Sequence, residues 1–176
     1  MSRDPSTAII PSLGDARSRA LAERLKHRAR ELTEPQRSRV TERLAHTLFI
    51  SHTSADDAFI KGSDEGTCPP KPGSIWWIAG NHFYDPFYHS FITGGAEEYE
   101  RIVGLALLAS RRVLVVWSKN ALRSDYVRAE ILIATEGAKR VAVYVAPYAP
   151  QFPIAGVSLI YDVEALDQLL FSWKRP

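Results

Sequence analysis

The chain has 176 residues, of which 45% are hydrophobic and 24% charged, the composition of one ordinary globular domain. Its net charge of +2 is too small to indicate a nucleic-acid-binding protein, whose domains usually carry a concentrated basic face. The single cysteine, Cys68, excludes an internal disulfide and a thiolate metal cluster. No secretion signal opens the sequence and no apolar run is long enough to span a bilayer, so we expect a cytoplasmic protein that binds neither nucleic acid nor membrane.

The N-terminal part of the chain is predicted to be a polar tail followed by a basic helical hairpin. Residues 15–32 place leucines on one helical stripe and arginines elsewhere. The segment Thr33-Glu-Pro-Gln36 combines a hydroxyl cap, a first-turn proline and a glutamine at the reciprocal capping position, so a second helix is expected to about residue 45. The arginines favour a solvated face, with an acidic partner as the alternative. We therefore divide the chain into residues 1–46 and 47–176.

From residue 47 onward the sequence alternates between strand and helix patterns. Strands are expected, in chain order, at residues 47–50, within 75–84, and at 113–117, 141–145 and 157–161. Helices are expected at residues 54–60, 95–109, 124–137 and 163–173, and a loop at 61–73. Five strands with intervening helices predict an α/β fold with a doubly wound parallel sheet. Only residues 146–156, three of them proline, separate the last two strands, so a loop is expected to connect them.

The most informative stretch is Arg111-Arg-Val-Leu-Val-Val-Trp-Ser118 with the segment 119–130 that follows it. It predicts a buried strand that ends in a hydroxyl, a short loop, and a helix capped by Ser124. Tyr126 and Glu130 are four residues apart on that helix, so both project from one face. Open α/β sheets bind their ligands just past the carboxyl ends of their strands. A carboxylate beside an aromatic ring at this position is therefore a candidate active site.

These segments resemble the TIR (Toll/interleukin-1 receptor-like) domain family. Leu48-Phe-Ile-Ser-His52 resembles the family's first-strand motif, and Ser54-Ala-Asp-Asp57 resembles the start of its first helix. Phe83-Tyr-Asp85 resembles the end of the second strand, before the loop through which family members self-associate. The most specific match is that of residues 113–118 and 124–130 to the third strand and the helix after it, with Tyr126 where the family usually has tryptophan.

The resemblance covers residues 47–173 and implies a TIR domain with a flavodoxin-like five-stranded parallel sheet of order 2-1-3-4-5. Many prokaryotic members of this family cleave the nicotinamide–ribose bond of NAD+ and use the reaction in phage defence, self-killing or effector activity. By this resemblance NAD+ is the substrate, Glu130 is the catalytic carboxylate, and neither a cofactor nor a metal is required. The residues implied to contact the substrate are Ser51, His52, Tyr84, Asp85, Ser118 and Tyr126.

One carboxylate is sufficient for this reaction, because nicotinamide in NAD+ is already a cationic pyridinium and leaves as a neutral molecule without a proton. Ordinary glycosides need a second carboxyl group to protonate the leaving oxygen. An ionised Glu130 would stabilise the oxocarbenium ribose and bind its hydroxyl groups. In the 2-1-3-4-5 order the loops after the first and third strands meet, which would bring Ser51 and His52 close to Ser118 and Glu130.

Several alternatives remain open from the sequence. Glu130 could face solvent, and Ser51 and Ser118 could be structural hydroxyls that satisfy strand ends. The spacing of His82, Asp85 and His89 permits a metal site, although no cysteine supports it. The aromatic residues of segment 76–91 favour a satellite core, or else a surface through which copies associate. The alternative to an enzyme is a non-catalytic TIR module that signals through TIR–TIR self-association, with an upstream sensor or a downstream effector protein as its partner. An enzyme could release either linear or cyclic ADP-ribose.

Overall fold

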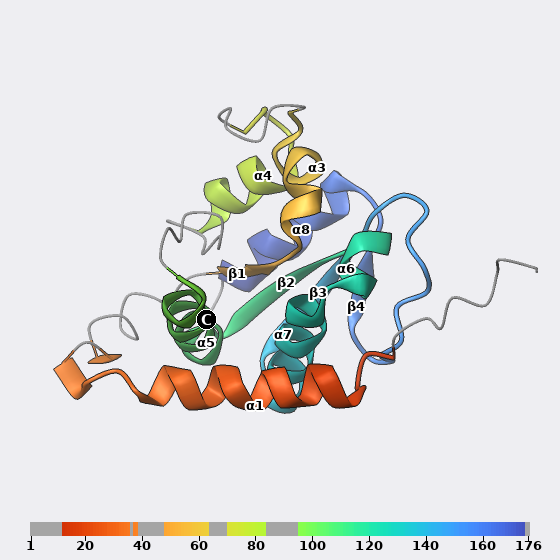
Figure 1. Ribbon diagram of the computed structural model, residues 1–176. Helices are drawn as coiled ribbons and strands as arrows, with labels where there is room; N and C mark the ends of the chain where they lie inside the picture. Colours follow the sequence, from red (N-terminus) through yellow and green to blue (C-terminus); the bar gives the residue numbers. More distant parts are fainter. Residues whose placement is uncertain (1–11, 36, 39–47, 64–69, 84–94, 175–176) are drawn as a thin grey trace, which may run out of the picture.

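The computed structural model describes residues 12–35, 37–38, 48–63, 70–83 and 95–174. These residues form an α/β fold in which helices cover both faces of a four-stranded parallel sheet (Figure 1). Within them, no helix combines the length and the apolar character that crossing a bilayer requires.

The strands lie in the sheet in their chain order. They are β1 Leu48–Ser51, β2 Arg112–Trp117, β3 Arg140–Val145 and β4 Ser158–Ile160. Each corresponds to a strand predicted from the sequence, so the first, third, fourth and fifth predicted strands are confirmed. The loop between β3 and β4 is also confirmed, and it is held against β2 because the Trp117 indole donates to the Pro150 carbonyl at 2.8 Å and packs edge-on against Phe152.

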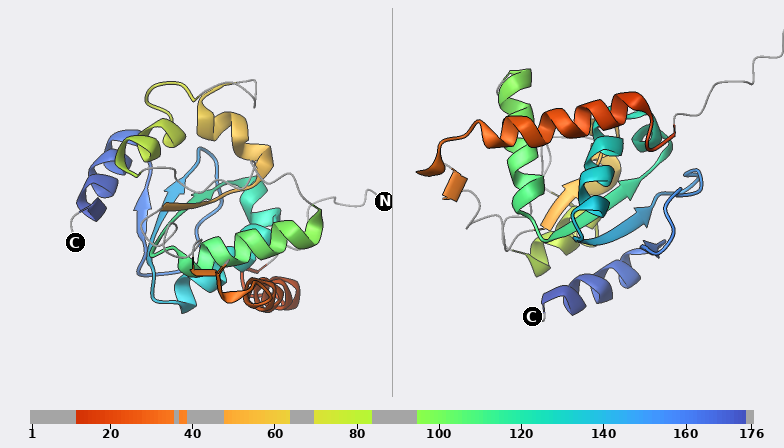
Figure 2. Two further views of the ribbon diagram at one scale, coloured as in Figure 1. Left: turned by 90° about the vertical axis from the view of Figure 1, so that its left-hand side faces the viewer. Right: turned by 90° about the horizontal axis from the view of Figure 1, so that it is seen from below.

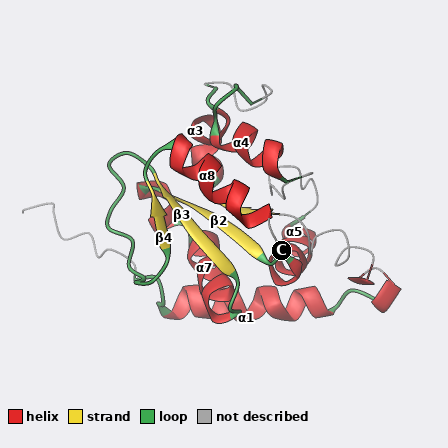
Figure 3. Cartoon of the chain, turned by 180° about the vertical axis from the view of Figure 1, so that it is seen from behind, coloured by secondary structure: helices red, strands yellow, loops and turns green. Residues whose placement is uncertain are grey.

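Helices make up most of the remaining described chain (Figure 3). They are α1 Ala16–Arg30, the 3₁₀ turn η1 Ser54–Asp56, α3 Asp57–Lys61, α4 Ile75–His82, α5 Ala96–Ala109, α6 Lys119–Arg123, α7 Asp125–Glu136 and α8 Val163–Lys174. The helices predicted within residues 15–32 and at 54–60, 95–109, 124–137 and 163–173 are thereby confirmed. The short loop expected before α7 is helical instead, and most of the predicted second N-terminal helix lies outside the described residues.

The prediction of a strand within residues 75–84 is wrong, because residues 75–82 form α4. Ser74 caps this helix, since its hydroxyl accepts a hydrogen bond from the Trp77 N–H at 3.3 Å. Ile75, Ile78 and Ala79 are buried, and their spacing is that of one helix face. The aromatic and β-branched residues of the segment suggested a strand, but packing against the core overrides such propensities. The described sheet therefore has four strands rather than five.

The two faces of the sheet bury separate apolar clusters. In β1, Phe49 points toward the layer that contains α5 and α7, whereas Leu48 and Ile50 point toward α4 and α8. In β2, the same alternation sends Val115 to the first layer and Leu114 to the second. Ser51 shares the parity of Phe49 and therefore faces α7.

Helix α1 lies outside α5 and α7 and crosses both (Figure 2). Its Leu21, Ala22 and Leu25 join the apolar cluster beneath these helices. The two helices α1 and α5 come very close at Gly104 of α5, where a Cβ atom would lie 2.3 Å from the Leu25 carbonyl oxygen. Only glycine permits this approach, so Gly104 is what allows α1 to pack closely against α5.

Candidate active site

Glu130 lies in the second turn of α7 and points toward the sheet. The Ser124 hydroxyl caps this helix by accepting from the Val127 N–H at 3.3 Å, as predicted. The Glu130 side chain faces the interior, since the residue is only 1% exposed. Ser51, the last residue of β1, donates its hydroxyl hydrogen to Glu130 Oε2 at 2.5 Å. A buried carboxyl group is thus joined to the carboxyl end of a parallel strand.

Burial determines the charge of this carboxyl group. It raises the pKa of Glu130 to about 8, and the hydrogen bond from Ser51 offsets only part of the increase. Glu130 is therefore mainly protonated at neutral pH in this conformation, whereas the sequence analysis expected an ionised carboxylate. Its second oxygen, Oε1, is buried and has no hydrogen-bond partner among the described residues. That oxygen remains able to accept a hydrogen bond from a ligand hydroxyl.

Two tyrosines lie beside the carboxyl group. Burial raises the pKa of the Tyr99 phenol, and Glu130 and Tyr126 raise it further because both are ionised at the high pH where this phenol titrates. The Tyr99 and Tyr126 rings pack edge-to-face, with centroids 5.3 Å apart. Tyr99 was not among the site residues predicted from the sequence. Its position on the inward face of α5 was the available signal, but the sequence did not show that α5 meets α7 there.

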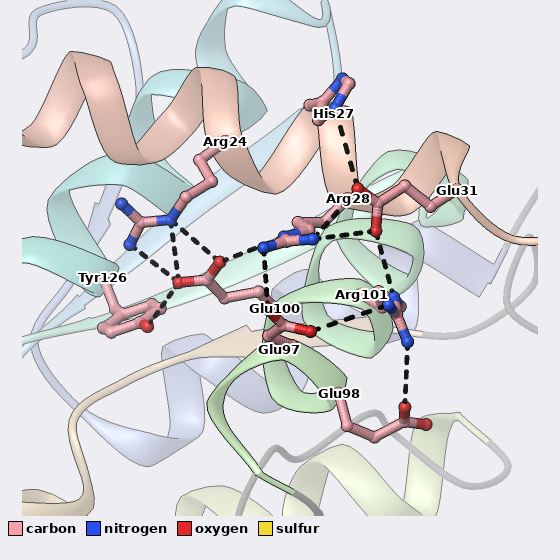
Figure 4. A network of polar contacts seen from close by, with 9 residues as sticks. All are labelled: Arg24, His27, Arg28, Glu31, Glu97, Glu98, Glu100, Arg101 and Tyr126. Atoms are coloured by element: carbon pink, nitrogen blue, oxygen red, sulfur yellow. Dashed lines mark hydrogen bonds and ion pairs between the residues drawn. The ribbon is translucent and has the colours of Figure 1, made fainter.

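Tyr126 is held in place by a hydrogen bond to a buried carboxylate, which also forms an ion pair with an arginine (Figure 4). Its hydroxyl donates to Glu100 Oε1 at 3.0 Å, and the Arg24 guanidinium binds both oxygens of the same carboxylate at 2.8–3.0 Å. Arg24 is the main reason that the pKa of Glu100 lies below its usual value. These three side chains come from α7, α5 and α1, so they connect the N-terminal helix to the helix face that carries Glu130.

Other ion pairs extend this network along α1 and α5 (Figure 4). Arg28 contacts Glu31 at 3.1 Å and Glu97 at 3.2 Å. Arg101 contacts Glu31 at 3.2 Å. Arg24 and Arg28 of α1, which the sequence left open to an acidic partner, are therefore paired within the chain.

A second polar cluster lies at the carboxyl ends of β1 and β2. The Ser118 hydroxyl donates to Asp56 Oδ2 at 2.5 Å, and the Asn120 side-chain amide donates to the other oxygen of Asp56 at 2.9 Å. Ser118 also caps α6 by accepting from two backbone N–H groups. His52 is buried, with Nε2 3.1 Å from Asp57 Oδ1. Asp56, the acceptor shared by two of these side chains, was not among the predicted site residues.

The predicted site residues therefore fall into three groups. Ser51 contacts Glu130 directly, and Tyr126 lies beside it through Tyr99. Ser118 and His52 belong to the second polar cluster, in which the Ser118 hydroxyl donates to Asp56 and not to Glu130. The remaining two, Tyr84 and Asp85, lie outside the described residues.

The metal site considered at His82, Asp85 and His89 is described only at its first residue. His82 Nε2 lies 2.6 Å from Asp167 Oδ1 on α8, and the other two residues lie outside the described chain. Within the described residues, no group of three or more His, Cys, Asp or Glu side chains is arranged to hold a metal ion.

Comparison with protein-family models, with curated proteins and with solved structures gave no match to this chain. The resemblance to TIR domains therefore rests on the sequence motifs, and the function is argued from the geometry described above.

Removing the hydroxyl of Tyr126 by Tyr126→Phe is expected to lower the free energy of unfolding by about 1 kcal/mol, because its hydrogen bond to a buried carboxylate can no longer form. Combining it with Glu100→Gln should cost less than the sum of the two single changes, since both remove the same interaction. Urea unfolding of the four proteins measures this coupling. Tyr161→Phe, at a tyrosine that is 66% exposed, is the matched control and should change little. Strict additivity would contradict the hydrogen bond between Tyr126 and Glu100.

Proposed function

We propose that this chain is a TIR-type NAD+ glycohydrolase that cleaves the nicotinamide–ribose bond, with Glu130 as the catalytic carboxylate. The observation that carries the proposal is the buried Glu130–Ser51 hydrogen bond at the carboxyl end of β1, 2.5 Å long, in which the second carboxyl oxygen has no hydrogen-bond partner among the described residues. A glutamate with a purely solvated role would face water, whereas this one is 1% exposed. A strongly shifted pKa in a specific polar setting is typical of functional carboxyl groups.

In this proposal Glu130 is neutral before the substrate binds and becomes ionised during the reaction. A neutral carboxyl group tolerates burial, whereas a carboxylate there requires a compensating positive charge. NAD+ supplies one, first on the pyridinium ring and then on the oxocarbenium ribose as nicotinamide leaves. Substrate binding would therefore lower the pKa of Glu130, which would release its proton to water and become a carboxylate where the positive charge develops. Ser51 would keep the carboxyl group oriented, and Tyr99 and Tyr126 would line one side.

The architecture is compatible with the proposed flavodoxin-like fold. The four described strands lie in the sheet in the order β1-β2-β3-β4, as the first, third, fourth and fifth strands of that fold do. Helices lie on both faces, with α5 and α7 on one and α4 and α8 on the other.

The direct test is to incubate purified protein with NAD+ and follow nicotinamide release by chromatography. Glu130→Gln should reduce the rate at least 100-fold, because the neutral amide cannot stabilise the sugar cation. The matched control is Glu136→Gln, at an exposed glutamate on the same helix, which should retain activity. Chromatography of the ribose product separates linear from cyclic ADP-ribose. The assay should include high protein concentration and a crowding agent, since family members often complete the site between copies. Release that is unaffected by Glu130→Gln would refute the assignment.

The second candidate is a non-catalytic TIR module that acts by self-association, with a sensor or effector protein as its partner. It is favoured by one observation, namely that Glu130 is buried and mainly neutral, as a structural carboxyl group would be. This candidate predicts no nicotinamide release by the wild-type protein in any assembly. For the enzyme, the proposed role is in bacterial defence against phage, through a released ADP-ribose signal or through depletion of NAD+.

A further inference from the structure

A hollow of about 580 Å³ lies at the amino ends of β2 and β3. It is formed by residues 108–112, at the end of α5 and the start of β2, and by residues 137–140, between α7 and β3. Glu130 and the second polar cluster lie toward the carboxyl ends of the strands, so this hollow is at the opposite end of the sheet. We call it the basic hollow.

Positive charge is concentrated around the basic hollow. Among the described residues, its lining includes Arg111, Arg112, Lys139 and Arg140 and no carboxylate. Arg112 and Arg140 are directly paired at the first rung between β2 and β3, and the Arg140 N–H donates to the Arg111 carbonyl at 3.0 Å. Like charges on paired strand positions repel each other. Burial is the main cause that lowers the pKa of the Arg112 guanidinium, and the charges of Arg140 and Arg111 lower it further.

The four cations differ in what they already contact. Arg112 donates to the Trp173 carbonyl and lies over the Phe83 ring, so its guanidinium is directed toward α8 and α4. Lys139 donates to the Leu108 and Ser110 carbonyls at 2.9 and 2.6 Å, which fixes it at the rim. Arg111 and Arg140 are exposed and form no ion pair with any described residue.

One buried polar group of the basic hollow also lacks a hydrogen-bond partner among the described residues. Ser110 lines it and is fully buried, and its hydroxyl has no hydrogen-bond partner among the described residues. A buried hydroxyl without a hydrogen-bond partner is unfavourable. Ser110 therefore has an unused hydrogen-bonding position within the wall of the hollow, and Arg111 and Arg140 provide guanidinium donors at its surface with no described carboxylate to pair with them.

We propose that the basic hollow binds a small ligand that carries two or more phosphate groups, separately from the Glu130 site. Its volume falls within the usual range for small-molecule sites, roughly 300–1,000 Å³. Arginine is suited to bidentate contacts with phosphate, and both Arg111 and Arg140 line the basic hollow. The ligand's negative charge would relieve the repulsion within the cluster. A single anionic group would leave part of that charge uncompensated, which favours two phosphates over one.

The test uses inorganic pyrophosphate as the probe and the full chain, with binding measured by calorimetry at low salt. Pyrophosphate is expected to bind at least tenfold more tightly than inorganic phosphate. The double variant Arg111→Ala/Arg140→Ala should weaken pyrophosphate binding about 100-fold, or about tenfold for each guanidinium removed.

The matched control is Arg17→Ala/Arg123→Ala, which removes the same net charge from exposed positions on α1 and α6. It should bind pyrophosphate within about twofold of the wild-type protein, and thermal unfolding should confirm that both double variants are folded. Equal weakening in the two double variants would indicate nonspecific attraction to net charge and overturn the proposal. The absence of pyrophosphate binding to the wild-type chain at millimolar concentration would also overturn it.

Discussion

Replacing Glu130 with glutamine is expected to stabilise the folded chain increasingly as the pH rises. The advantage of Glu130→Gln over the wild-type protein should grow by about 3 kcal/mol between pH 5 and pH 8. The substitution keeps the shape of the side chain and its ability to bond with Ser51, but it removes the ionisable group. Urea unfolding of both proteins at several pH values measures the difference.

The sign of this effect follows from the two pKa values of Glu130. In the unfolded chain the ordinary value is 4.5, whereas in the folded chain burial raises it to about 8. Above pH 4.5 the unfolded state loses its proton while the folded state retains it, so protons favour folding over this range. The stabilising contribution of the neutral carboxyl group is complete below pH 4.5 and is lost as the pH rises through 8. Glutamine does not titrate, so the variant avoids this loss.

Glu100→Gln provides a control of opposite sign. Arg24 lowers the pKa of Glu100, so the stabilising contribution of that carboxylate is present above pH 4.5 and is lost as the pH falls through its folded-state pKa. Glu100→Gln should therefore destabilise the chain at pH 7 and have a smaller effect in acid. A gain from Glu130→Gln that does not change with pH would contradict the buried, protonated carboxyl group.

These stability measurements are independent of the enzymatic assay, and the two together separate the proposed functions. If Glu130 is catalytic, Glu130→Gln should abolish nicotinamide release and also stabilise the fold. This is the trade-off between stability and activity that is common at active sites. A structural Glu130 predicts the gain in stability in a protein that has no NAD+ cleavage to lose. The rate of nicotinamide release should also rise with pH toward 8 if deprotonation of Glu130 limits it.

Replacing Gly104 with alanine is expected to destabilise the chain by about 3 kcal/mol, at the upper end of overpacking effects. The added Cβ would lie 2.3 Å from the Leu25 carbonyl oxygen and 3.0 Å from its carbon, both backbone atoms of α1. Neither atom can rotate away, so α1 must shift from α5. Because α1 also supplies Arg24, this shift should weaken the interactions among Arg24, Glu100 and Tyr126 and lower any activity that depends on Tyr126. Urea unfolding measures the loss of stability.

Gly80→Ala in α4 is the matched control, since a Cβ atom there would meet no other atom within 4 Å. Alanine is the better helix former by about 1 kcal/mol, so this substitution should leave stability unchanged or raise it. If Gly104→Ala behaves like Gly80→Ala, then α1 does not approach α5 as closely as described.

The sequence alone was sufficient for elements whose signals are local. The apolar run before Ser118 identifies β2, and the hydroxyl of Ser124 identifies the start of α7, because caps and strand patterns depend on neighbouring residues. The spacing of Tyr126 and Glu130 likewise establishes that they share one helix face. Segment 75–82 was predicted incorrectly because its aromatic residues fit a strand or a buried helix, and only the packing partner distinguishes the two.

The tertiary structure decided which side chains meet and in what state of charge. Glu100 comes from a helix whose sequence reveals only an inner stripe, yet it holds Tyr126 because α5, α7 and α1 converge there. The pKa of Glu130 depends on how completely the surrounding helices and sheet exclude water, which is a property of the assembled core. The need for glycine at position 104 arises from the backbone carbonyl of Leu25, far away in the chain. Local patterns specify elements and faces, whereas side-chain partners and electrostatics arise from residues that are distant in the sequence.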